Sequence, residues 1–181
     1  MNIRAGDRRS GGRVAEPGAA DSANSITTLL AVLDRAYNRP SWHGANLRGS
    51  LRGVPVSQAS RRPHPSRHNI WEVVVHAAYW KYAVRRRLLR EPRGSFPLAG
   101  SNWFLRPDGE LSTAAAWRRD LLLLDETHQA LRESVAALTC ADLSESRGGR
   151  GKVTVFDIVA GIAAHDVYHA GQIQLLKRLV R

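Results

Sequence analysis

Residues 154–178 read TVFDIVAGIAAHDVYHAGQIQLLKR, and this stretch decides which fold the chain is expected to adopt. Its apolar residues recur three and four positions apart, the spacing of one face of a helix, as at Ile158 and Ile162. His165 and His169 continue the same face, because residues four apart in a helix lie on the same side. The stretch therefore predicts a long helix that turns two imidazoles towards the protein interior.

Three earlier segments show the same periodicity, over residues 26–37, 70–91 and 112–138. A shorter helical pattern lies in SWHGANLRGSLRGV, residues 41–54, after the first of them. No segment shows the alternation of apolar and polar residues that is typical of a strand. The fold class expected is therefore all-α, a four-helix bundle with a short extra helix after the first long one.

Capping residues mark the starts of two of these helices. Asn69 is a good N-cap residue, and Glu72 stands three positions later, as in a capping box. Thr154 and Asp157 repeat this arrangement at the start of the last helix. Both helices that carry candidate functional histidines are therefore expected to begin at defined residues.

Two connections between the helices are expected to lack regular structure. Pro55, Pro63 and Pro65 mark a loop before the second long helix. The segment 92–110 is rich in proline and glycine but too apolar for a plain linker, so it is expected to drape over one end of the core. Its length is compatible with an up-down bundle and with other arrangements of the helices.

The size and composition predict one folded domain. The chain has 181 residues with 43% hydrophobic residues, enough for a substantial core. Residues 1–22 hold almost no large apolar side chain and are expected to be a disordered basic, glycine-rich tail before a single domain at 23–181. The absence of a signal-like or membrane-length apolar run and the single cysteine favour a cytoplasmic protein without a membrane partner.

The net charge of +11 is confined to one segment. Residues 35–93 hold 13 lysine and arginine residues and 2 glutamates, whereas the rest of the chain is balanced. The segment lacks the motifs of a specific nucleic-acid reader, so nucleic acid is not expected as the main partner. The alternatives are an anionic small-molecule substrate, an anionic partner, or a solvated face.

A third histidine completes a candidate metal site. His76 interrupts the apolar pattern WEVVVHAAYWKY, residues 71–82, much as His165 and His169 interrupt the apolar face of the last helix. A single buried histidine is most simply explained as a hydrogen-bonded core residue. Three on two helices that pack side by side favour a metal, because a metal offsets the desolvation of neutral imidazoles. Three protein nitrogens plus solvent are typical of an open, catalytic site.

These segments also resemble a known family. The stretches WHGANLRGSL, HNIWEVVVHAAYWKYAVRRRL and GIAAHDVYHAGQIQLLKR are similar to the DinB/YfiT-like superfamily of metal-binding four-helix bundles, over about residues 25–181. The resemblance implies a divalent metal ion, zinc, nickel or iron-like, held by His76, His165 and His169 with solvent completing the shell. It also implies a thiol-dependent S-transferase or isomerase or a metal-dependent hydrolase, and a homodimer.

The reaction stays open at the level of sequence. Metal-bound water could attack an electrophilic small-molecule substrate, or the metal could present the sulfur of a low-molecular-weight thiol. The absence of a convincing general base near the site favours the thiol. The sequence is compatible with an enzyme and also with the alternative, a non-catalytic metal-binding stress-response protein in which the metal holds two helices together.

Residues around the three histidines have weaker predicted roles, and the catalytic group itself is unknown. His43 is a possible fourth ligand or proton carrier, and Gln172 could orient a ligand or substrate. Glu72 is interpreted as a cap rather than a ligand. Asp166 is expected to point away from the metal, into a second-shell or surface contact, and Tyr168 to pack. Residues expected away from the chemistry are Cys140, His128 inside the bundle, and the exposed His64 and His68.

Overall fold

The computed structural model describes residues 19–94, 96–108, 111–147 and 153–180. Within these ranges the chain is helical, and its single bridge between extended residues pairs Ser146 with Thr154. The predicted all-α class is confirmed. No helix in these ranges is both long and apolar enough to cross a membrane.

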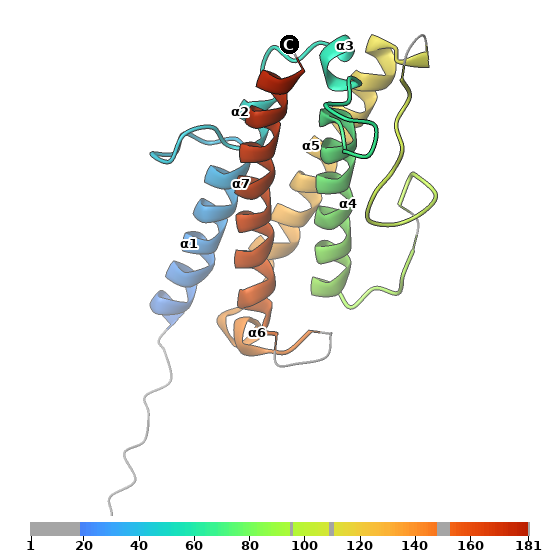
Figure 1. The fold of residues 1–181 in the computed structure, drawn as a ribbon. Helices are drawn as coiled ribbons and strands as arrows, with labels where there is room; N and C mark the ends of the chain where they lie inside the picture. The colour runs from blue at the N-terminus through green and yellow to red at the C-terminus, as the bar shows by residue number, and fades with distance from the viewer. Residues whose placement is uncertain (1–18, 95, 109–110, 148–152, 181) are drawn as a thin grey trace, which may run out of the picture.

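Four long helices form the body of the fold. Helix α4 packs against α5 and α7, and α1 packs against α7 and α5, which closes a ring. Figure 1 shows that α1 and α7 run in one direction and α4 and α5 in the other, because the segment after α4 returns along the bundle before α5 begins. The connections are therefore not those of an up-down bundle. The long helices are α1 (Ala19–Tyr37), α4 (Ile70–Leu88), α5 (Ala114–Ala136) and α7 (Val155–Leu179).

Three short helices occupy the connections. Helix α2 (Leu47–Ser50) matches the predicted extra helix. Helix α3 (Val56–Ala59) lies where a loop was predicted, and this expectation was wrong because Pro55 serves as its N-cap, where a missing N–H does no harm. Helix α6 (Cys140–Ser144) was not predicted, although Thr139 caps it.

The predicted caps are present at both helices that carry the histidines. Asn69 Oδ1 accepts a hydrogen bond from the backbone N–H of Glu72 at 2.8 Å, and Glu72 Oε2 accepts one from the N–H of Asn69 at 3.4 Å. Thr154 and Asp157 exchange the equivalent bonds at 3.2 and 2.9 Å. These capping boxes fix where α4 and α7 begin, and so set the register of their side chains.

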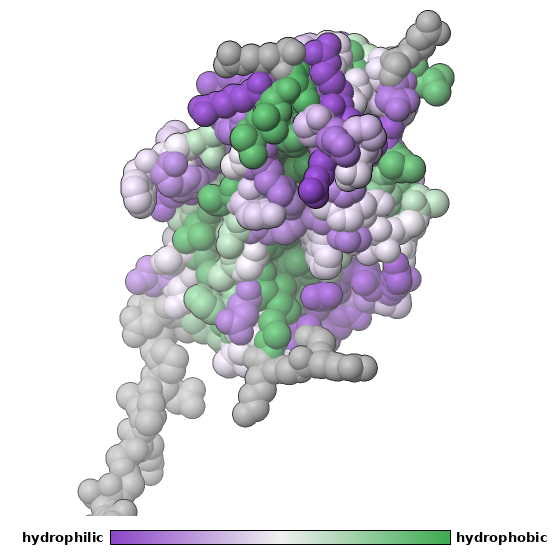
Figure 2. Space-filling model, viewed as in Figure 1, coloured by the Kyte–Doolittle hydropathy of each residue, from purple (hydrophilic) through white to green (hydrophobic). Residues whose placement is uncertain are grey.

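Helix α7 presents apolar residues to solvent as well as to the core. Phe156 near its start is 50% exposed, and Leu175 and Leu179 near its end are 58% and 60% exposed. Figure 2 shows apolar surface at both ends of this helix. The exposed apolar residues of α7 are therefore candidates for a binding surface.

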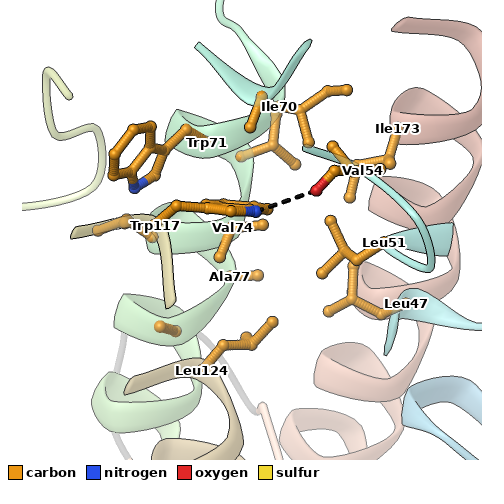
Figure 3. Close-up of a cluster of buried hydrophobic side chains, with 14 of the residues drawn as sticks. Leu47, Leu51, Val54, Ile70, Trp71, Val74, Ala77, Trp117, Leu124 and Ile173 are labelled. Atoms are coloured by element: carbon orange, nitrogen blue, oxygen red, sulfur yellow. Dashed lines mark hydrogen bonds between the residues drawn. The ribbon is translucent and has the colours of Figure 1, made fainter. Parts of the chain in front are cut away.

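The core consists of two apolar clusters with a polar layer between them. In the cluster shown in Figure 3, Trp117 Nε1 donates a hydrogen bond to the carbonyl oxygen of Val54 at 3.1 Å, and its ring meets Trp71 edge to face at 5.5 Å. The polar layer contains Lys81 and Asp166, whose side chains are fully buried. The remaining labelled residues of the cluster are Leu47, Leu51, Ile70, Val74, Ala77, Leu124 and Ile173.

The basic segment 35–93 is partly neutralised within the fold. Arg48 pairs with Asp125 at 2.9 Å, and Arg90 pairs with Glu145 at 2.7 Å. Similar pairs join Arg62 to Glu72, Lys81 to Asp166 and Arg85 to Glu91.

The tail expected at 1–22 lies mostly outside the described residues. Helix α1 already begins at Ala19, inside the range predicted for that tail.

Candidate metal centre

Three imidazoles from two helices converge on one point. His76 comes from the second turn of α4, and His165 and His169 come from the middle of α7. One ring nitrogen of each lies within 4.8 Å of the others. His165 Nε2 is 3.2 Å from His76 Nε2 and 3.0 Å from His169 Nε2. The structure thus brings together the three histidines expected from the sequence, and no other such cluster occurs in the described part of the chain.

Hydrogen bonds at the outer nitrogens fix the tautomers of two rings. His76 Nδ1 lies 2.8 Å from the backbone carbonyl oxygen of Asn102, which can only accept, so this nitrogen carries the proton. His169 Nδ1 donates to Gln172 Oε1 at 2.6 Å, while the Gln172 amide nitrogen donates to the Tyr168 hydroxyl at 2.9 Å. The Nε2 atoms of His76 and His169 therefore both present lone pairs to the centre.

His165 cannot satisfy both of these lone pairs. With its proton on Nε2 it donates to one neighbour, and the lone pair of the other stays unmatched. With its proton on Nδ1, three lone pairs face one another, and Nδ1 itself is buried without a hydrogen-bond partner among the described residues. Unmatched buried polar atoms are costly, and a cation that accepts all three lone pairs removes the mismatch. The donor set therefore fits a divalent metal ion.

The electrostatics keep the three rings neutral. Burial lowers the pKa of His165 to about 3, with His169 and His76 adding to the effect. Burial likewise lowers the pKa of His169 to about 4 and holds the pKa of His76 below its usual value of 6.5. At neutral pH the imidazoles are in the deprotonated form that binds metals.

The segment between α4 and α5 supplies two contacts that were not predicted. Asn102, whose carbonyl oxygen accepts from His76, has a positive φ of 65°, a conformation that asparagine tolerates better than most residues. Its side-chain oxygen accepts a hydrogen bond from Trp80 Nε1 at 3.0 Å. Trp103 stacks on the His76 ring with centroids 3.9 Å apart, and His68 stacks on Trp103 at 3.7 Å. The segment was expected to drape over one end of the core, and the structure places its residues Asn102 and Trp103 beside the histidines.

A buried ion pair lies next to the cluster. Asp166 follows His165 in the chain and pairs with Lys81 of α4, with both side chains 0% exposed. Of the two contacts expected for Asp166, behind the metal ligands or at the surface, the surface contact was wrong, because the carboxylate is buried and pairs with Lys81. Burial raises the pKa of Asp166 and lowers that of Lys81, and their mutual attraction opposes both shifts. The Lys81 ammonium also lies 4.8 Å from the centroid of the Tyr37 ring.

The other predicted residues fall into distinct places. Glu72 is a cap, as interpreted. Burial alone would raise the pKa of Glu72, but the hydrogen bonds from Arg62 and His68 outweigh burial and bring the pKa below its usual value of 4.5. Tyr168 is 63% exposed; its ring packs edge to face against His169 at 5.1 Å, and its hydroxyl accepts a hydrogen bond from Gln172. His43 is exposed in the loop before α2 and is not part of the cluster. His64 and His68 are exposed, His128 is buried and stacked on Tyr37, and Cys140 begins α6.

The comparisons with known proteins agree with this arrangement. The family model of the DinB superfamily matches residues 41–173, which include all three histidines and most of the helices described. No curated protein and no solved structure matches the chain. Because the family match extends over well more than half of the sequence, the chain belongs to the DinB superfamily.

Proposed function

We propose that the chain binds a divalent metal ion through His76, His165 and His169 and acts on a small molecule as a metal-dependent thiol S-transferase or hydrolase. Membership of the DinB superfamily and the three-histidine cluster fit metal binding. The observation that carries the proposal is the convergence of three Nε2 atoms, two of which are lone-pair donors fixed by their own hydrogen bonds.

The donor set supports an open site rather than a closed structural one. Structural zinc sites have four protein ligands, whereas catalytic sites have three and leave a position for solvent or substrate. Among the described residues, the cluster holds three histidines and no carboxylate or thiolate. Neutral imidazoles suit zinc, nickel and iron. A divalent ion held there would act as a Lewis acid that lowers the pKa of a water molecule or a thiol in its remaining position.

The residues around the cluster hold the ligands in place. Asn102 and Gln172 fix the orientation of His76 and His169, and Trp103 covers one ring. The cluster contains no carboxylate that could act as a general base, which supports a low-molecular-weight thiol as the activated group over water. Gln172 and His43 remain the proposed helpers of catalysis. Gln172 would act through its contact with His169, whereas His43 would require a movement of its loop towards the cluster.

The competing proposal is a non-catalytic metal-binding stress-response protein, in which the ion holds α4 to α7. Removing the metal with a chelator separates the two. A structural role predicts a large fall in melting temperature, since the ion then contributes to folding. A catalytic role predicts a folded metal-free protein that loses turnover.

Elemental analysis of purified protein beside the His76→Ala variant tests the site itself. We expect about one metal ion per chain in the wild type and much less in the variant. His64→Ala is the matched control, because His64 is exposed and lies outside the cluster. Stoichiometric metal in His76→Ala would remove His76 from the site.

Two further proposals concern assembly and location; the first rests on the family resemblance and the second on the sequence composition. A homodimer predicts a species of twice the chain mass of 20.0 kDa in sedimentation equilibrium. A cytoplasmic location predicts recovery in the cytosolic fraction of the cells that produce it. Binding to DNA or RNA is not proposed, and association even at low salt, where phosphate contacts are strongest, would overturn that position.

A further inference from the structure

A cavity of about 390 Å³ lies beside the three histidines. Its walls come from the loop before α4, from Val73 of α4, from the segment between α4 and α5, and from the C-terminal half of α7. Two of the side chains that line it, Trp103 and Gln172, are the ones that contact the rings of His76 and His169. The cavity therefore adjoins side chains that are in direct contact with two of the candidate metal ligands.

The wall that α7 contributes is apolar and open to solvent. Leu175, Leu176 and Leu179 line the cavity, and the first and last are 58% and 60% exposed. Figure 2 shows apolar surface at the C-terminal end of α7, flanked by hydrophilic side chains. An occupant with an apolar body would remove this surface from water, which favours binding.

One cation at the cavity is available to a ligand. Arg67 lines the cavity and is exposed, and no hydrogen bond or ion pair of its guanidinium is found within the described ranges. The neighbouring Arg62 is committed to Glu72 and to the backbone carbonyl of Arg67. Among the described residues that line the cavity there is no carboxylate, and Glu72, which pairs with Arg62 and His68, is 1% exposed. The charge at the cavity is therefore positive.

We propose that this cavity binds the substrate, and that the substrate is a small molecule with an apolar body and an anionic group. The apolar body lies against the leucines of α7, and the anionic group pairs with Arg67. The volume is within the usual range of about 300–1,000 Å³ for small-molecule sites. This inference rests on the proposed function, because it names the class of small molecule on which the metal centre would act; Trp103 and Gln172 touch both the cavity and the candidate ligands.

Decanoate is a suitable probe, and the full-length protein as purified is titrated with it by calorimetry. We expect saturable binding with one molecule per chain. Arg67→Gln should weaken it about tenfold or more, since a charge-assisted hydrogen bond is lost. Leu175→Asp should weaken it at least as much, because it places a negative charge against the apolar body.

Matched variants control for general effects of charge and polarity. Leu122→Asp alters a leucine of α5 that is also 58% exposed but does not line the cavity. Arg87→Gln removes an exposed arginine of α4 that likewise does not line the cavity. Both should bind decanoate as the wild type does. Decyltrimethylammonium, which has the same chain and the opposite charge, should bind the wild type more weakly than decanoate does.

A second readout connects the cavity to the histidines. In protein substituted with Co²⁺, decanoate should shift the visible absorption of the ion, because the occupant contacts Trp103 and Gln172, which in turn hold His76 and His169. The Leu122→Asp variant should show the same shift, and Leu175→Asp should not.

Four results would overturn the inference. Two concern decanoate itself: no binding to the wild type, or binding to Arg67→Gln and Leu175→Asp that is as tight as to the wild type. The other two are tighter binding of the cationic probe than of decanoate, and an unchanged Co²⁺ spectrum at saturating decanoate. A wild-type dimer that Leu175→Asp converts to monomers would also overturn it, since the leucine face would then belong to a second copy. Failure of the proposed function is read separately: a wild type that takes up no metal but binds decanoate through Arg67 would retain the cavity and lose the metal centre.

Discussion

Replacing Lys81 with methionine removes one partner of the buried ion pair that joins α4 to α7. Both side chains are 0% exposed, and Asp166 Oδ1 already lacks a hydrogen-bond partner within the described ranges. Without the ammonium, the carboxylate is either an uncompensated buried charge or must take up a proton. Breaking such a pair costs about 3–5 kcal/mol. That is a large part of the roughly 5–15 kcal/mol by which folded proteins are stable.

The double variant Lys81→Met/Asp166→Leu distinguishes a broken pair from lost packing. Both charges are then absent, and apolar side chains of similar length fill the space. We expect most of the stability lost by either single variant to return, because apolar replacement of a whole buried pair is often neutral or stabilising. The sum of the single losses should exceed the loss in the double variant by several kcal/mol.

Urea unfolding followed by circular dichroism measures these free energies. The measurement uses protein freed of metal with a chelator, so that linkage to the ion does not enter. Arg87→Met, on the exposed side of α4, is the control and should stay within about 0.5 kcal/mol of the wild type. A loss below about 1 kcal/mol in Lys81→Met, or strictly additive losses in the double variant, would refute the reasoning.

Three further changes have defined outcomes. Gln172→Ala removes the acceptor of the His169 N–H and should lower metal affinity about 10- to 100-fold, measured by competition with a chelator; unchanged affinity would contradict the orienting role. Thr154→Ala removes the cap of α7 and should cost about 1 kcal/mol in urea unfolding, whereas an equal midpoint would show that the cap contributes nothing. Glu72→Gln tests the lowered pKa of Glu72: above pH 4.5 the wild type should be more stable than the variant, and this advantage should disappear as the pH falls through the lower pKa of the folded state. Stability curves of the two proteins that stay parallel from pH 3 to 7 would be the opposing result.

The parts of the structure that sequence alone predicted depend on local interactions. A capping box needs residues only three positions apart, so Asn69 with Glu72 could be recognised before any tertiary contact was known. The pairing of His165 with His169 likewise follows from helical geometry over one turn. His76 could be associated with them because it interrupts an apolar face, where an unexplained imidazole is costly.

The parts that were missed depend on contacts between distant segments. The acceptor for His76 is the backbone carbonyl of Asn102, and a carbonyl leaves no trace in residue type. The pair of Lys81 and Asp166 spans 85 positions, and neither residue by itself differs from one on a solvated face. The positive φ of Asn102 could be predicted only weakly from sequence, because the only indication is that asparagine tolerates this conformation better than most residues.

The placement of the ion pair also bears on how the histidines are held. Lys81 and Asp166 connect the same two helices as the cluster, one position from His165 and five from His76. Such a pair contributes little net stability, but it can form only when α7 and α4 are aligned in one register, so it favours that register over others. Asn102 and Gln172 then fix the rings within that register. The three imidazole nitrogens are thus held together by contacts that do not involve an ion. Under the proposed function, a cation that accepts all three lone pairs would remove their mismatch, and the rigidity of the surrounding helices would then contribute to metal affinity.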